Sequence, residues 1–168
     1  MKAGLWIAAT FELHVLNWSD LSMKVSTTRF GEVKIEADDI LLFRSGLVGF
    51  EDCQHWVILA DGTNEAVAWM QSMNRPEISL PVVSPRRFLP DHQVRIEGRD
   101  VEALQLTDLD QAFVLCVVSD NDQSLTVNLK APLIMNLDRR LGCQVVTSDD
   151  QPLAHLLVEL PSKLKKSA

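Results

Sequence analysis

The chain of 168 residues contains no tyrosine, and only 6% of its residues are aromatic. Nucleic-acid-binding barrels of the OB type stack bases on aromatic side chains that lie among basic residues. In this sequence Trp56 and Trp69 stand in apolar segments with few cations nearby. The aromatic content therefore weighs against a surface on which bases stack.

Cysteine is also scarce, with three residues, Cys53, Cys116 and Cys143, and no C-x-x-C pair. An odd number without that spacing excludes a disulfide framework, and no second Cys/His pair stands at zinc spacing. Cys116 lies in the apolar segment 113–118, where a buried, reduced thiol is expected. We therefore expect a cytoplasmic protein that holds neither a metal nor a cofactor.

Catalytic motifs are missing as well: there is no G-x-S-x-G elbow and no glycine-rich phosphate loop. Asp120, Asp122 and Ser124 resemble the first ligands of a calcium loop, but Leu125 replaces the required glycine and Ala131 the bidentate glutamate. We predict that the protein is not an enzyme. A small hydrolase stays open as a class, and assays with generic ester and phosphate substrates would detect it.

An excess of basic residues is absent too, because 16 basic and 23 acidic side chains give a net charge of −7. Affinity for a nucleic-acid backbone comes from Lys and Arg that replace counterions on phosphates, so this balance disfavours direct binding of RNA or DNA. From Glu97 to Asp122 there are seven acidic residues against Arg99 alone, a net charge of −6. This stretch is either a solvated face or a surface that attracts a basic partner. The residues proposed for such an acidic steering face are Glu102, Asp108 and Asp110.

No hydrophobic run is long enough to span a bilayer, so we expect no membrane association. The apolar stretch near the start is interrupted by Glu12 and His14. We interpret residues 1–22 as an N-terminal extension or as a start assigned too early, because Met23 would make an ordinary start. The intact mass of the native protein distinguishes these two. Residues 151–168 are interpreted as a solvated C-terminal tail, which leaves one domain over residues 23–150.

The body of the chain consists of short apolar or alternating segments separated by Gly, Pro, Asp and Asn, a pattern typical of β-strands. One segment, residues 99–106, has the pattern of a short helix. The count predicts a mainly β fold, a single-domain antiparallel β-barrel-like structure of about nine strands with one or two short helices. The segments expected to form strands are 25–30, 31–36, 40–43, 56–60, 67–73, 78–83, 112–119, 125–130, 133–135 and 144–147.

Two of these segments carry more specific expectations. Pro81 cannot donate a hydrogen bond to a ladder, so the segment 78–83 is predicted to be an edge strand or a bulged strand. In the segment 125–130 apolar and polar residues alternate. Because successive side chains of a strand point to opposite faces, Asn128 and Lys130 are expected to face away from the apolar side.

Several blocks of the sequence, taken in order, resemble the FliW family of flagellar assembly factors. The two most specific blocks are Gly-Leu-Val-Gly-Phe-Glu at 46–51 and Val-Asn-Leu-Lys-Ala-Pro at 127–132. The resemblance extends from about Val25 to Thr147. The remaining residues that carry it lie at 28–33, 40–43, 69–72, Arg140, Gly142 and 144–146.

This resemblance implies a barrel-like cytoplasmic protein without catalytic activity. Members of the family bind the RNA-binding translational repressor CsrA and relieve its repression of flagellin mRNA. They also bind flagellin as chaperone-like partners, and flagellin competes with CsrA. An acidic protein suits a basic RNA-binding partner. The alternative function is a small OB-like barrel that binds nucleic acid directly, whose affinity for RNA would depend steeply on salt.

The candidate partner-binding residues come from the blocks that carry the resemblance. Gly46 and Gly49 permit a tight loop, in which Leu47 is expected to be exposed as a contact. Whether the aromatic ring after Gly49 anchors the loop or meets a partner stays open. A buried glutamine at position 71 would need hydrogen-bond partners and could serve either the core or a pocket. The full set is Phe43, Leu47, Gly49, Phe50, Gln71, Asn128, Lys130 and Pro132.

Overall fold

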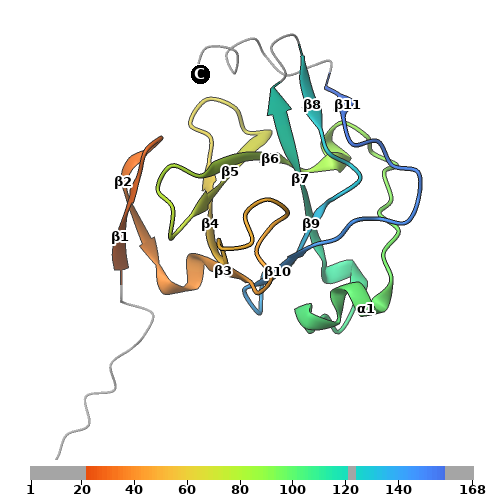
Figure 1. Ribbon diagram of the computed structural model, residues 1–168, viewed down its shortest axis with the longest axis horizontal. Coiled ribbons are helices and arrows are strands. Elements are labelled where there is room, and N and C mark those ends of the chain that lie inside the picture. Colours follow the sequence, from red (N-terminus) through yellow and green to blue (C-terminus); the bar gives the residue numbers. More distant parts are fainter. Residues whose placement is uncertain (1–21, 121–123, 158–168) are drawn as a thin grey trace, which may run out of the picture.

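A closed β-barrel forms the centre of the molecule (Figure 1). The computed structural model describes residues 22–120 and 124–157. Hydrogen bonding runs around the ring in the order β3-β4-β5-β6-β7-β9-β10, and β10 pairs back to β3. The strands of the ring are β3 (Ile40–Phe43), β4 (His55–Ala60), β5 (Val67–Ser72), β6 (Ser79–Val83), β7 (Phe113–Asp120), β9 (Leu133–Asn136) and β10 (Leu141–Gln144).

The β-barrel predicted from the sequence is confirmed, with one pair of strands that differs from the expected antiparallel arrangement. β3 and β10 are parallel, with Leu42 opposite Leu141 and Phe43 opposite Gly142. All other neighbours in the ring are antiparallel. A ring of strands that alternate in direction can close antiparallel only if their number is even. Because this ring has seven strands, the closing pair must be parallel.

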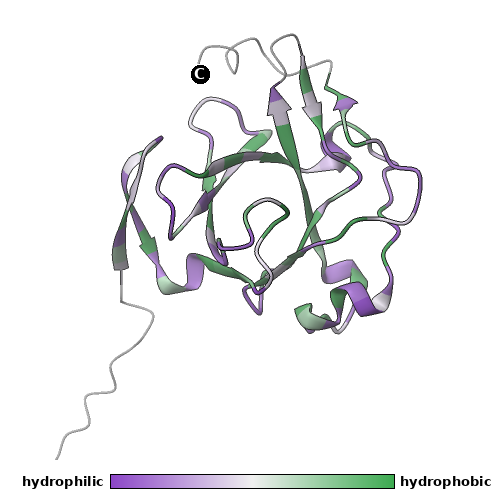
Figure 2. Ribbon diagram, viewed as in Figure 1, coloured by the Kyte–Doolittle hydropathy of each residue, from purple (hydrophilic) through white to green (hydrophobic). Residues whose placement is uncertain are grey.

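The alternation of side chains along β4 shows how the sequence fills the barrel. Trp56 and Ile58 pack into the central core, whereas Val57 and Leu59 face outward and contact other clusters. Phe43, Trp56 and Met70 are completely buried in this arrangement. Burial of one such side chain contributes about 1.5–3 kcal/mol to folding. Figure 2 shows hydrophobic residues along the strands of the ring and hydrophilic residues in the loops and helical turns.

A hairpin of β1 (Ser22–Thr27) and β2 (Gly31–Glu36) packs on the outside of the barrel. Arg29 lies in the turn between β1 and β2, and its guanidinium carbon is 3.6 Å from the centroid of the Trp69 ring. Phe30 meets the same ring edge to face at 6.0 Å. The Trp69 indole N–H donates to Asp61 Oδ2 at 2.9 Å and thereby lowers the pKa of that carboxyl group. These contacts cover Trp69, which is 4% exposed.

The sheet continues beyond the ring through β8 (Leu125–Val127) and β11 (His155–Leu156). β11 pairs with β8, and Leu157 is buried in a second hydrophobic cluster together with Val127 and Leu129. The ordered fold therefore extends past residue 150, where we had expected the C-terminal tail to begin. The sequence between β7 and β8, where a turn was expected, falls at residues 121–123, outside the described residues.

Pro81 has a specific place in β6, which lies between β5 and β7. β6 pairs with β5 over its whole length, from Ser79 to Val83, but with β7 only at Val82 and Val83. The N–H of Ser72 donates to the carbonyl oxygen of Ile78 at 3.0 Å. Because backbone groups of successive residues point to opposite sides of a strand, the backbone nitrogen of Pro81, three residues later, faces β7. The missing donor therefore coincides with the absence of pairing on that side. The expectation of an edge strand was wrong, because β6 has a neighbouring strand on each side. Pro81 nevertheless coincides with the short pairing between β6 and β7.

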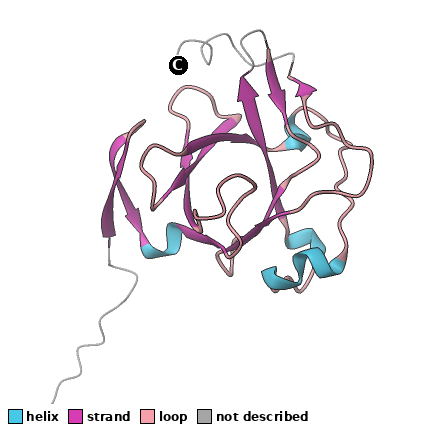
Figure 3. Ribbon diagram, viewed as in Figure 1, coloured by secondary structure: helices cyan, strands magenta, loops and turns pink. Residues whose placement is uncertain are grey.

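The predicted helical segment 99–106 is observed as α1 (Gly98–Val101) followed by the 3-10 turn η4 (Glu102–Leu104). Val101 and Leu104 are buried in a cluster against β9 and β10. The other 3-10 turns of residues 22–120 and 124–157 are η2 (Ala37–Asp39), η3 (Pro85–Arg87) and η5 (Leu109–Gln111) (Figure 3). Within the described part of the chain, no helix is long and apolar enough to cross a membrane.

Candidate partner-binding site

The loop of residues 44–54 between β3 and β4 folds over one end of the barrel, where Figure 1 shows it in orange inside the ring. We refer to these residues as the plug loop. Leu47, Phe50 and Cys53 of this loop pack against the central core. Leu47 and Phe50 also exchange two backbone hydrogen bonds, of 3.2 and 2.8 Å. The plug loop is thus held both by apolar packing and by its own backbone.

Two glycines give the plug loop its shape, since both have left-handed backbone angles, with φ of +66° at Gly46 and +84° at Gly49. At Gly46 an added Cβ atom would lie 2.5 Å from the carbonyl oxygen of Phe50, so a side chain does not fit. At Gly49 no atom lies within 4 Å of an added Cβ. The N–H of Gly49 donates to Glu51 Oε1 at 2.9 Å, and this bond lowers the pKa of the Glu51 carboxyl group.

The expected exposure of Leu47 was wrong, because this side chain is 3% exposed and belongs to the barrel core. The exposed residue is its neighbour Val48, at 69%. Phe50 is half-buried, and Phe43 is completely buried beneath the loop. Val48 is therefore the large apolar side chain that the plug loop presents to solvent.

Gln144, at the end of β10, links the two sequence blocks that carry the family resemblance. Its Oε1 accepts a hydrogen bond from the N–H of Val48 at 2.8 Å. Its Nε2 donates to the carbonyl oxygen of Ala131 at 3.1 Å. Residues 96 positions apart in the sequence are therefore joined by one side chain. In the sequence this residue belonged to a predicted strand and to the segment 144–146 of the family resemblance, and neither gave a sign of this role.

The candidates in the second block lie beside that link. Asn128 Oδ1 accepts from the N–H of Ala131 at 3.0 Å, and Lys130 Nζ donates to the carbonyl oxygen of Asp149. Both side chains are half-buried, and Pro132 is buried. Asn128 and Lys130 thus stabilise the local chain, and their part in partner binding stays a prediction.

We expect the substitution Gln144→Ala to loosen the plug loop with little change in the barrel. It removes two hydrogen bonds, each of which contributes about 1 kcal/mol net. Amide hydrogen exchange should show faster exchange at Val48 and unchanged exchange in β4 and β5. Equal protection of Val48 in the variant and the parent would contradict the role assigned to Gln144.

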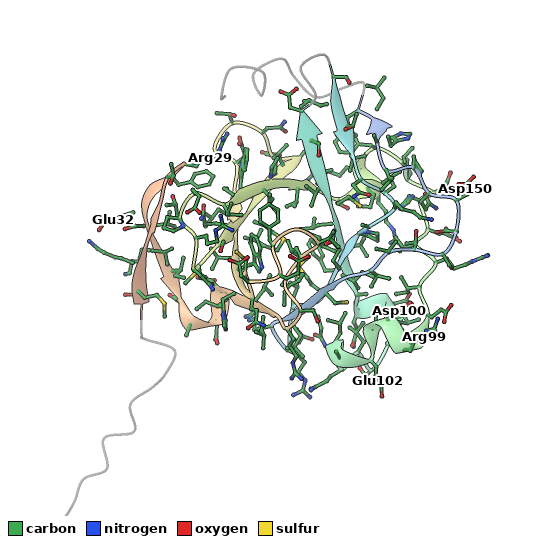
Figure 4. All side chains as sticks on the ribbon, viewed as in Figure 1. Arg29, Glu32, Arg99, Asp100, Glu102 and Asp150 are labelled. Carbon is green, nitrogen blue, oxygen red and sulfur yellow. The ribbon has the colours of Figure 1, made fainter. Side chains whose placement is uncertain are left out.

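An acidic helical segment borders the plug loop. A cleft of about 220 Å³ is lined by Arg44, Ser45 and Gly46 on one side and by Asp100 and Ala103 on the other. Figure 4 shows Arg99, Asp100 and Glu102 together on α1 and the turn that follows it. The exposed Glu102 therefore lies on the element that forms one wall of this cleft.

The other two residues of the predicted steering face lie on the next helical turn. Asp108 precedes η5, and its Oδ1 accepts from the N–H of Asp110 at 3.0 Å. Both carboxylates are exposed. Asp110 lines a different groove, together with Leu109 and Phe113. The structure therefore places Glu102 close to the plug loop and Asp110 beside a second surface.

Gln71 is not part of either surface, because it is completely buried on β5. Its Nε2 lies within hydrogen-bonding distance of the carbonyl oxygens of Ser72, Pro76 and Ile78, at 3.0, 3.2 and 3.0 Å. These contacts hold the turn between β5 and β6. Of the two roles left open for Gln71, the structure supports the one in the core.

The groups around the plug loop are suited to binding. Cys143 lines the cleft, but burial and the nearby charge of Asp100 raise the pKa of its thiol to about 11. A thiol with that pKa stays protonated at neutral pH and is a weak nucleophile. Within residues 22–120 and 124–157, no group of three or more His, Cys, Asp or Glu side chains could hold a metal ion. The cleft offers apolar, amide and charged contacts, as a protein-binding surface does.

A family model, curated relatives and a solved structure all match the same protein family. A family model described as FliW protein matches residues 24–157. The flagellar assembly factor FliW of Bdellovibrio bacteriovorus is 39% identical over 130 residues, which cover 76% of this chain and 74% of that protein. The corresponding protein of Natranaerobius thermophilus is 35% identical over 127 residues, covering 74% and 84%. A crystal structure of the flagellar assembly factor FliW superposes with a TM-score of 0.75 at 26% identity, covering 84% of this chain and 99% of that one.

Proposed function

Since the chain belongs to the FliW family of flagellar assembly factors, we propose that it binds the translational repressor CsrA and thereby relieves repression of flagellin mRNA. It also binds flagellin as a chaperone-like partner, and flagellin competes with CsrA. The level of free flagellin then controls further synthesis of flagellin. The reaction is an exchange of protein partners, and no covalent step is involved.

The observation that carries this proposal is the position of the acidic helical segment beside the plug loop. Asp100 of α1 lines the cleft there and forms an ion pair with Arg99 at 3.8 Å, and Glu102 is exposed on η4, the turn that follows α1. A repressor that binds RNA has a basic surface. Complementary charge raises the rate of association, and an exposed apolar residue such as Val48 adds contact area after the encounter. CsrA held in this way is removed from its mRNA.

A cytoplasmic location follows from this function, because CsrA and the mRNA it represses are there. The cysteines fit a reducing compartment. Cys53, Cys116 and Cys143 are all free, and burial raises the pKa of the Cys116 thiol to about 12.

Direct binding of nucleic acid is the weaker candidate. Trp56 is completely buried, and Trp69 is covered by Arg29 and Phe30. Neither indole is therefore available for stacking on a base, which is a main source of affinity for single strands. We expect negligible binding of RNA, and a steep dependence of RNA affinity on salt would favour the other candidate.

The proposal is tested by mixing the purified protein with CsrA and, separately, with flagellin, followed by size-exclusion chromatography. Each partner should elute with the protein at micromolar concentration. If neither partner co-elutes, the proposed function is wrong. If only one co-elutes, the proposal keeps that partner and loses the other.

Charge reversal tests the acidic face. In the double variant Glu102→Lys and Asp108→Lys, the association rate with CsrA should fall about tenfold at low salt, because electrostatic steering is lost. The difference should shrink as salt screens the charges. Stopped-flow measurements at several salt concentrations give both results. The control is Glu32→Lys on the hairpin, which Figure 4 shows far from α1. Equal rates for the double variant and the control would reject the acidic face as the contact.

A further inference from the structure

The end of the barrel opposite the plug loop carries an apolar groove. Because β4 runs away from the plug loop, the turn between β4 and β5 lies at this other end. A groove of about 520 Å³ is found there, which we call the open-end groove. Side chains of the central core line it, among them Ile58, Ala68, Val82 and Leu115. Phe113, which is 42% exposed, also lines it. Apolar side chains exposed beside an apolar groove mark a surface that another segment or molecule covers.

The described chain ends in the hydrophobic cluster that borders this groove. Leu157, the last described residue, is 7% exposed and shares its cluster with Val67 and Val83. Both valines line the open-end groove. Residues 158–168 lie outside the described residues, and eleven residues of extended chain span up to about 35 Å. The segment that follows Leu157 is therefore anchored within reach of the groove.

The open-end groove has an excess of acidic side chains. Asp61 and Glu65 line it against Arg87 alone, and neither carboxylate forms an ion pair with another described residue. Asp61 is ionised at neutral pH, because the hydrogen bond from the Trp69 indole lowers the pKa of its carboxyl group. Glu65 is exposed in the same turn. The groove is thus suited to an apolar segment that carries basic residues.

An adjoining groove of about 330 Å³ does not change this balance. It shares Phe113 with the open-end groove and adds one acid, Asp110, and one base, Arg86. His92 also lines it and is uncharged at neutral pH, because burial lowers the pKa of its imidazole. The two grooves together present three carboxylates against two guanidinium groups.

The sequence of residues 158–168 complements such a lining. The segment contains three lysines and one glutamate, Glu159, so that it carries a positive net charge. Its lysines are Lys163, Lys165 and Lys166, and its larger apolar residues are Val158, Leu160 and Leu164. Apolar and basic side chains are therefore mixed over a length that matches a groove with a core-lined wall and acidic residues in its turn.

We propose that the C-terminal segment 158–168 lies in the open-end groove of its own chain. Its apolar side chains cover Phe113 and the core residues beside it, and its lysines pair with Asp61 and Glu65. The chain itself then closes both ends of the barrel, with the plug loop at one end and the C-terminal segment at the other. This proposal does not depend on the proposed function, and it leaves the plug loop free for a partner.

The experiment locates the segment in the full-length protein by NMR. In a Cys143→Ser background, which removes the one cysteine that is not buried, a nitroxide spin label is attached to Ser162→Cys. The label broadens the amide signals of residues near it. We expect broadening at Glu65 and Phe113 and none at Met23 in β1. Unbroadened signals at both groove residues would overturn the proposal.

Charge variants test how the segment is held. Replacement of all three lysines by glutamate should lower the paramagnetic relaxation enhancement at Glu65 about threefold or more, because attraction to the groove becomes repulsion. The matched control replaces the same lysines by arginine, which keeps the charge and should keep the enhancement. Glu65→Lys alone should lower the enhancement at Phe113, and its combination with the three glutamates should restore part of it. Glu65 is exposed, so this substitution does not disturb the core. Equal enhancement in the glutamate and arginine variants would show that the lysines do not hold the segment.

Two further outcomes would assign the segment to another place. Broadening at Asp100 and Glu102 in place of the groove would mean that the basic segment binds the acidic helical segment. A mixture of spin-labelled protein with isotope-labelled protein that carries no spin label detects contact between copies. Broadening in this mixture as strong as in the single chain would mean that a second copy supplies the segment. Either result overturns the proposal, and neither affects co-elution with CsrA or flagellin.

Discussion

Replacement of Gly46 by alanine should destabilise the protein by about 2–5 kcal/mol. A left-handed backbone angle costs a residue with a Cβ atom about 1–2 kcal/mol, and the angle at Gly46 is φ +66°. The new Cβ would also lie 2.5 Å from the oxygen of Phe50 and 2.6 Å from Cα of Glu51. These are backbone atoms, so relief requires movement of the plug loop, and overpacking of this kind costs about 1–3 kcal/mol. Urea unfolding followed by tryptophan fluorescence measures the change.

Gly49→Ala provides a matched control within the same loop. Its φ of +84° carries a similar conformational cost, but no atom lies within 4 Å of the added Cβ. We expect a loss of only about 1–2 kcal/mol. Gly46→Ala should also weaken CsrA binding, because the loop that carries Val48 has to move. Equal destabilisation by the two alanines would show that the close approach at Gly46 has no energetic weight.

The second large effect is expected from Phe43→Ala. This side chain is completely buried in the central core and packs against Gly142 of the strand that closes the barrel. Truncation of a buried phenylalanine costs about 3–5 kcal/mol, since transfer energy is lost and a cavity remains. The same unfolding experiment measures it, and a loss below 1 kcal/mol would mean that the barrel wall collapses to fill the space.

The contact between Phe43 and Gly142 can be tested with the substitution Gly142→Ala. A Cβ at this position would lie 2.2 Å from Cζ of Phe43, so the substitution alone should cost about 1–3 kcal/mol. Phe43→Leu removes the ring atoms that would clash. In the double variant the two costs should sum to more than the observed loss by at least about 0.5 kcal/mol. Simple additivity would contradict the close packing of Phe43 on Gly142.

Much of the fold could be predicted from the sequence, because the strands are short and local. The segments 31–36, 40–43 and 67–73 closely match β2, β3 and β5, and the helical pattern at 99–106 matches α1 and η4. The direction of the closing pair could not be predicted, since β3 and β10 are far apart in sequence and no turn links them. β8 ends at Val127, although the alternating pattern predicted a strand over 125–130. Thr126 is buried, although the same pattern placed it on the face toward solvent.

The sequence named partner-binding candidates in both blocks, but it could not tell which of their side chains reach solvent. Both sequence blocks meet at the candidate site, yet Leu47 points into the core and Val48 into solvent. In a loop the period of two that assigns strand faces does not apply, so adjacent apolar residues cannot be told apart. The role of Gln144 depends on a contact across 96 positions, which no local pattern reports.

The parallel pair of β3 and β10 also sets the order of events during synthesis. Leu42 pairs with Leu141, so the ring cannot close until most of the chain has left the ribosome. Contacts between such distant positions form late and slow folding. Gln144, which braces the plug loop, follows the closing contact by only a few residues. A nascent chain therefore has no finished plug-loop surface until β10 has left the ribosome.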